Sequence, residues 1–143
     1  MWYEALELAR YVISECMRRG KPLSNLKLQK ILYYVWVNYF RETGRYIFID
    51  DICAWQLGPV IPVVYYEYCS YAGRPISNIY PTGISDQDQL LINSILDKYI
   101  DVSASTLVSW THQSGSAWDC VYKNGEGNKK VIPFQLIISK EVG

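Results

Sequence analysis

The stretch NLKLQKILYYVWVNYF, residues 25–40, constrains the fold more than any other part of the chain. Ser24 has the features of a helix N-cap, Leu23 and Leu28 stand at the positions of a hydrophobic staple, and Gly44 provides a stop. After Lys30 the expected helix is apolar on nearly all sides. Such a helix is packed from several directions, so the sequence predicts a central helix surrounded by the rest of the chain.

Other segments are expected to pack around this central helix. Apolar residues at steps of three and four, with caps or stops, predict helices over residues 2–19, 61–71, 85–99, 103–110 and 116–122. Residues 45–55 favour a short β-hairpin or irregular arm before the break at Gly58-Pro59. The tail 131–139 has the composition of a strand, but Pro133 permits a short helix, which we expect. The predicted fold is mainly α, a compact single-domain helical bundle over residues 1–143.

Composition narrows the classes of function. Of 143 residues, 50% are apolar and 20% are charged, which is typical of a globular protein. Basic and acidic residues number 14 each, which disfavours nucleic acid as a partner, because phosphate binding needs a basic excess. Four separated cysteines and one histidine, His112, form no zinc motif, and we expect no metal and no cofactor. Without a signal peptide or an apolar run of about 20 residues, we expect a cytoplasmic protein that makes no contact with membranes.

Residues 54–68, AWQLGPVIPVVYYEY, combine a tryptophan, two prolines and three tyrosines with a single charge. The segment is too apolar for an ordinary solvated loop and too rich in helix breakers for one continuous helix. It is therefore expected to be a hinge in the core, a binding surface, or both. The chain holds 13 Tyr and 5 Trp, and both residue types are enriched at protein interfaces.

Catalytic chemistry has little support in the sequence. His112 and Cys120 are the one candidate pair of base and nucleophile, but on a continuous helix eight residues would separate them by ~12 Å. A break at Gly115 would bring them closer, so this reading stays open as an alternative. No glycine-rich phosphate-binding loop is present. We expect that the protein is not an enzyme.

Three stretches, LSNLKLQKILYYV, DDICAWQLGPVIPVVYYEY and LVSWTHQSGSAW, occur in the order and spacing of a known pattern. Together they resemble the Panacea domain of the SocA-like antitoxin family. The likeness runs from the first expected helix to about Trp118. The residues that match the family motifs are Lys27, Gln29, Lys30, Trp55, Gly58, Pro59, Thr111, His112 and Trp118.

The resemblance implies the antitoxin of a bacterial or phage-borne toxin–antitoxin system, which neutralises a cognate toxin protein by direct binding. The resemblance also leaves two alternatives open. The protein could act as a proteolytic adaptor that delivers the toxin to an ATP-dependent protease, or it could be a phage-associated protein without an evident toxin. A DNA-binding autoregulator is the reading with least support, because the net charge is zero. A homo-oligomer is compatible with all of these readings.

The segment 54–68 then has two expected roles. In the structural role, Gly58-Pro59 turns the chain so that a joint forms in the core from Trp55, Pro59, Lys30 and His112. The polar groups buried there, including the Thr111 hydroxyl, need hydrogen-bond partners. In the functional role, tyrosines edge a groove in which a toxin segment docks. The tyrosines expected at this groove are Tyr33, Tyr34, Tyr39, Tyr65, Tyr66 and Tyr68.

Overall fold

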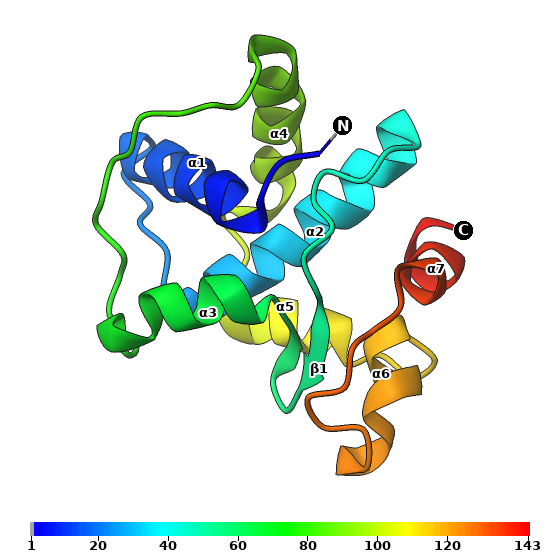
Figure 1. Cartoon of the computed structure of the whole chain (residues 1–143). Coiled ribbons are helices and arrows are strands. Elements are labelled where there is room, and N and C mark those ends of the chain that lie inside the picture. The colour runs from blue at the N-terminus through cyan, green and yellow to red at the C-terminus, as the bar shows by residue number, and fades with distance from the viewer. Residues whose placement is uncertain (1) are drawn as a thin grey trace.

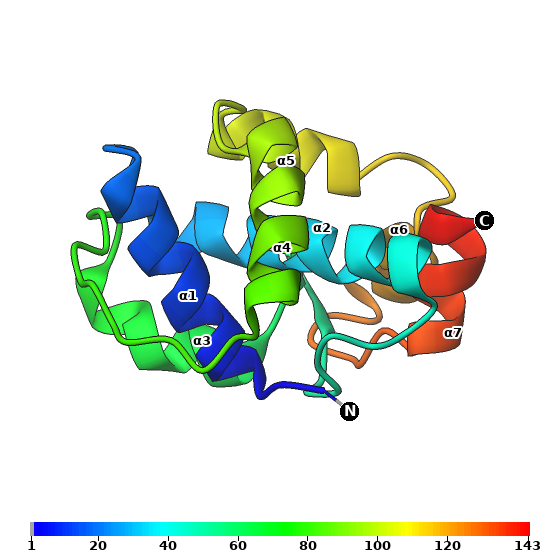
Figure 2. The ribbon, with the colours of Figure 1, turned by 90° about the horizontal axis from the view of Figure 1, so that it is seen from above.

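The computed structural model describes residues 2–143, and helix α2 (Asn25–Thr43) runs through its centre. Helices α1 (Ala5–Arg18), α3 (Pro62–Tyr68), α4 (Asp86–Tyr99) and α5 (Ala104–Thr111) all contact α2. Figures 1 and 2 show these helices around α2, with α7 (Phe134–Ile137) beside the C-terminal half of α2 and α6 (Ala117–Tyr122) next to α7. The mainly helical fold expected from the sequence is confirmed.

Helix α2 begins and ends at the predicted residues. The Ser24 side chain accepts a hydrogen bond from the Lys27 amide at 3.2 Å, and Gly44 closes the helix in the left-handed conformation with φ 70°. Trp36 is fully buried, and its indole N–H donates to the Phe48 carbonyl at 3.1 Å. Burial on nearly all sides explains why the apolar positions of this helix follow no single stripe.

Serine side chains cap the first three helices that follow the loop 74–84, which are α4, α5 and α6. Ser85, Ser103 and Ser116 each accept a hydrogen bond from the amide three residues further along the chain. This local bond satisfies one of the free amides of the first helical turn, which is why the starts of α4, α5 and α6 could be predicted from sequence.

None of the helices within residues 2–143 is both long enough and apolar enough to cross a membrane.

The β-hairpin is present, but it lies later in the chain than predicted. Strand β1 (Cys53–Trp55) pairs antiparallel with β2 (Gly58–Val60), and Trp55 stands opposite Gly58. Gly58-Pro59 is therefore the start of the second strand and does not follow the hairpin. The segment 129–132 bonds to the outer edge of β1, since the Ala54 amide donates to the Lys130 carbonyl at 2.8 Å.

Two further segments differ in detail from the expectation. The helix expected over 61–71 is α3 followed by a 3₁₀ turn, Cys69–Tyr71. The tail forms a helix, as expected, and not a strand: α7 continues into a π-helical turn, Ile138–Val142. Pro133 is the N-cap of α7 and does not stand in its first turn.

Candidate functional site

The three motif stretches meet at a buried joint between α2, the hairpin and α5. The Lys30 side chain is 0% exposed, and its amine donates to the Pro59 carbonyl at 2.8 Å. Gly58 lies in the same joint with φ 111°. A β-carbon at this glycine would stand 2.7 Å from the Thr111 hydroxyl oxygen and 2.8 Å from Lys30 Cε. Only glycine fits, because of both this backbone angle and the lack of space.

Trp118 fixes the turn between α5 and α6 to the hairpin. Its indole N–H donates to the Trp55 carbonyl at 2.7 Å. The His112 ring stacks on the Trp118 ring with centroids 3.9 Å apart and an interplanar angle of 5°. Of the residues expected in a joint, Lys30 bonds to Pro59, His112 lies on Trp118, and Trp55 contributes its backbone carbonyl. The Trp55 ring contacts Tyr65 instead.

Burial controls the charges in this joint. Desolvation lowers the pKa of the Lys30 amine to about 7. The pKa of His112 is lowered mainly by burial and then by the nearby Lys30, while Asp119 acts in the opposite direction. Thr111 donates to the Val108 carbonyl at 2.7 Å, but among residues 2–143 His112 Nε2 has no hydrogen-bond partner. The joint thus contains a buried lysine and a partly buried histidine, and its contacts hold α2, the hairpin and α6 together.

The joint does not pair His112 with Cys120 as a catalytic site would. The Cys120 thiol donates to the Gly115 carbonyl at 3.8 Å, while His112 is stacked on Trp118. No hydrogen bond joins the two side chains within the described part of the chain. Residues 2–143 also contain no cluster of three His, Cys, Asp or Glu side chains that could hold a metal ion.

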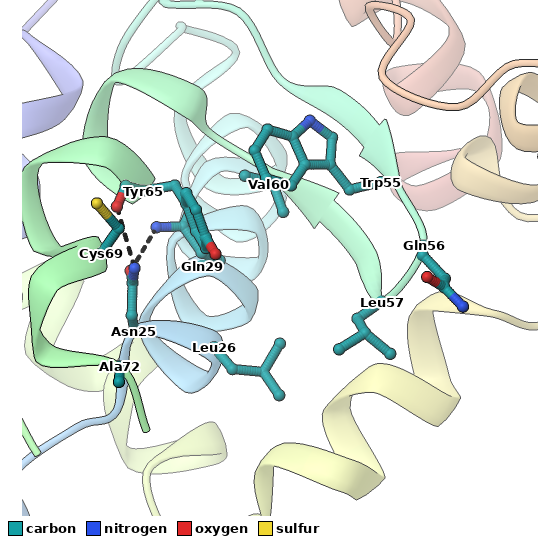
Figure 3. Close-up of a pocket in the computed structure, with 10 residues that line it drawn as sticks. All are labelled: Asn25, Leu26, Gln29, Trp55, Gln56, Leu57, Val60, Tyr65, Cys69 and Ala72. Atoms are coloured by element: carbon teal, nitrogen blue, oxygen red, sulfur yellow. Dashed lines mark hydrogen bonds between the residues drawn. The ribbon is translucent and has the colours of Figure 1, made fainter. Parts of the chain in front are cut away.

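Beside the joint, an open groove of about 340 Å³ lies between the hairpin and α3, over the first turns of α2 (Figure 3). The hairpin wall presents Trp55, Leu57 and Val60, and the opposite wall includes Tyr65. Leu26 of α2 also lines the groove. Within residues 2–143, no Asp, Glu, Lys, Arg or His lines it. A groove of this size and polarity fits apolar side chains of a partner.

Two buried amides connect both walls of the groove to α2. Gln29 accepts a hydrogen bond from the Ile61 amide at 2.9 Å and donates to Asn25 Oδ1 at 3.0 Å. Asn25 in turn donates to the Tyr65 carbonyl at 3.1 Å. Sequence reasoning named Gln29 and missed Asn25. The available signal was a pair of amide side chains four residues apart in the first turns of the helix.

An aromatic cluster stands at the mouth of the groove. Trp55, Tyr65 and Tyr66 contact one another with ring centroids 4.9 to 5.9 Å apart. The Lys129 amine lies 5.3 Å from the centroid of the Trp55 ring. Tyr66 is 61% exposed, and Leu57 at the hairpin turn is 52% exposed. Exposed aromatic and aliphatic side chains next to a groove are typical of a protein-binding surface.

The sequence comparisons agree with this geometry. The family described as "Antitoxin SocA-like, Panacea domain" matches residues 28–119, which hold the motif residues of the joint from Gln29 to Trp118. The chain belongs to the SocA-like Panacea family. It is 32% identical over 148 aligned residues to Antitoxin SocA of Caulobacter vibrioides (strain NA1000 / CB15N), an alignment that covers 93% of this chain and 77% of that protein. No solved structure matches the chain significantly.

Of the six tyrosines expected at a groove, two line its wall or mouth in this Panacea domain. Tyr65 is part of the wall, and Tyr66 is exposed beside it. Tyr33, Tyr39 and Tyr68 are only 2–3% exposed, so they belong to the core and do not edge an open groove.

The remaining tyrosine of the six, Tyr34 of α2, lies outside the groove as well. It is partly buried and stacks on Tyr99 of α4 with ring centroids 4.8 Å apart. The lysine at the start of the Panacea motif also has a structural contact, since the Lys27 amine donates to the Ile100 carbonyl at 2.6 Å.

Proposed function

We propose that this protein is the antitoxin of a toxin–antitoxin pair and that it neutralises its toxin by direct binding in the groove between the hairpin and α3. Membership of the SocA-like antitoxin family supports the class of function. The open groove with Trp55, Tyr65 and Tyr66 at its mouth is the observation that supports the mode of action. Large aromatic side chains around an apolar pocket commonly supply most of the binding energy of an interface.

The occupant that fits is an uncharged, apolar segment of the toxin. The groove offers no charged side chain for an ion pair within residues 2–143. Addition of a partner strand is also disfavoured, because both hairpin edges are occupied: the segment 129–132 covers β1, and Gln29 and Lys30 bond to Ile61 and Pro59 beside β2. Affinity therefore comes from burial of apolar side chains of the toxin against Leu57, Val60 and the aromatic cluster.

Co-expression with the product of the adjacent gene tests this function. We expect growth to be restored and a stable complex of defined stoichiometry to be recovered from purified components. The purified proteins should bind without any protease, because the proposal requires only occlusion of the toxin. Failure of this protein to restore growth would overturn the antitoxin function. Rescue that depends on an ATP-dependent protease and shortens the toxin's half-life would replace direct neutralisation with the adaptor mechanism.

A further inference from the structure

The edge of strand β2 is covered by two side chains of α2 where another strand would normally bond. Pro59 and Ile61 stand two residues apart, so their outward backbone groups belong to the same edge. The Pro59 carbonyl accepts from Lys30, and the Ile61 amide donates to Gln29, the neighbouring residue of α2. These two hydrogen bonds fix the position of the hairpin wall relative to α2.

We propose that Lys30 is a positioning residue of the groove: its buried amine holds the hairpin wall closed through the Pro59 carbonyl, and proton uptake by this amine favours an open wall. The inference deepens the proposed function, since the groove is the docking site proposed above. Lys30 does not line that docking groove and would act on the toxin only through the position of the hairpin.

The surroundings of the amine give it no compensating negative charge. Strand β2, which faces it, carries no titratable side chain. From α5 the titratable group is His112, which is basic, and Asp119 of α6 acts on that ring. On its own helix the neighbouring titratable side chains are Lys27, whose amine bonds to Ile100, and the tyrosines Tyr33 and Tyr34. A charged Lys30 in this site is therefore desolvated and unpaired, which is costly.

The direction of the pH dependence follows from proton binding. Burial lowers the pKa of Lys30 to about 7 in the closed state, while a solvated amine keeps a pKa of about 10.4. Between these values the open state binds one more proton than the closed state, so opening becomes easier as pH falls. The opening constant should rise about tenfold for each pH unit in this range and level off below about pH 7.

Amide hydrogen exchange in the free protein tests the proposal. Opening constants are obtained for the Ile61 amide, whose hydrogen bond to Gln29 joins the hairpin edge to α2, corrected for intrinsic exchange, between pH 7 and about pH 9. The wild-type protein should show the tenfold slope. Lys30→Met should remove the slope and, at about pH 9, increase opening about tenfold through loss of the hydrogen bond to Pro59.

Lys27→Met is the matched control, because this lysine also bonds a backbone carbonyl from α2 but lies away from the hairpin. It should keep the wild-type slope. A wild-type slope of zero, or an unchanged slope in Lys30→Met, would overturn the role of Lys30. The wild-type measurement alone decides this if Lys30→Met does not fold.

The same variants separate this inference from the proposed function. With the product of the adjacent gene as the probe, Lys30→Met should bind more weakly, by the factor by which its larger opening constant lowers the fraction of molecules with the hairpin wall held against α2. Lys27→Met should bind like the wild type. If the opening constant of the wild-type protein depends on pH as expected but the protein binds no toxin, the proposed function is refuted while the role of Lys30 in holding the hairpin stands. Lys30→Met that loses the slope yet binds toxin with full affinity would refute the link between hairpin position and docking.

Discussion

Replacement of Gly58 by alanine is expected to lower the free energy of unfolding by about 3 kcal/mol. Its φ of 111° is a backbone angle that residues with a β-carbon rarely adopt. The new methyl group would also overlap the Thr111 hydroxyl and the Lys30 side chain, which are both held in the buried joint. Relief of that overlap requires the hairpin to move away from α2 and α5. Urea denaturation at equilibrium measures the loss.

Gly44→Ala is the control for this prediction. Gly44 also has a positive φ, 70°, but nothing lies within 4 Å of the position of its β-carbon. The left-handed conformation alone should therefore cost about 1 kcal/mol. Equal losses in the two variants would show that the close approach of Lys30 and Thr111 to Gly58 contributes nothing to stability.

The helices of this fold could be predicted because their signals are local. Ser24 and Gly44 bound α2 in the sequence as they do in the structure, and Ser85 begins α4. A capping hydrogen bond links residues only three positions apart, so both partners can be found in a short stretch of the sequence. The outline of the helical bundle follows from such signals together with one all-apolar helix.

The register of the hairpin depends on contacts between distant residues, and for that reason the prediction placed it too early. Residue 59 bonds to Lys30, 29 positions earlier, and Ala54 bonds to Lys130, 76 positions later. Neither partner can be identified from the local pattern of residues 45–60. The structure brings three residues of the family motif, Lys30, Gly58 and Thr111, next to one another, although they are far apart in the sequence.

The candidate site was predicted only in part, and α2 shows why. A helix packed on all sides gives no periodicity from which outward tyrosines can be read. Tyr33 and Tyr39 are consequently core residues, whereas Tyr65 and Tyr66 lie on α3, where the groove leaves one face open. The orientation of the Trp55 ring toward Tyr65 likewise follows from the turn at residues 56–57, which sequence alone did not place.

A carboxylate at the hairpin turn should abolish most toxin binding without affecting the fold. Leu57 is 52% exposed and lines the groove, so Leu57→Asp should change the free energy of unfolding by no more than about 0.5 kcal/mol. The charge would have to be desolvated when an apolar toxin segment enters, and the apolar contact of the leucine would be lost as well. We expect an affinity about a hundredfold lower, as for the loss of a binding hot spot of about 3 kcal/mol.

Isothermal titration with the product of the adjacent gene and rescue of growth on co-expression measure this effect. Leu90→Asp is the matched control, because Leu90 is 74% exposed on α4 and does not line the groove. It makes the same change of charge and should bind and rescue like the wild type. If Leu57→Asp also binds like the wild type, the toxin docks elsewhere, and the exposed Trp110 on α5 becomes the next position to substitute. If both variants lose affinity equally, overall charge and not the groove controls binding.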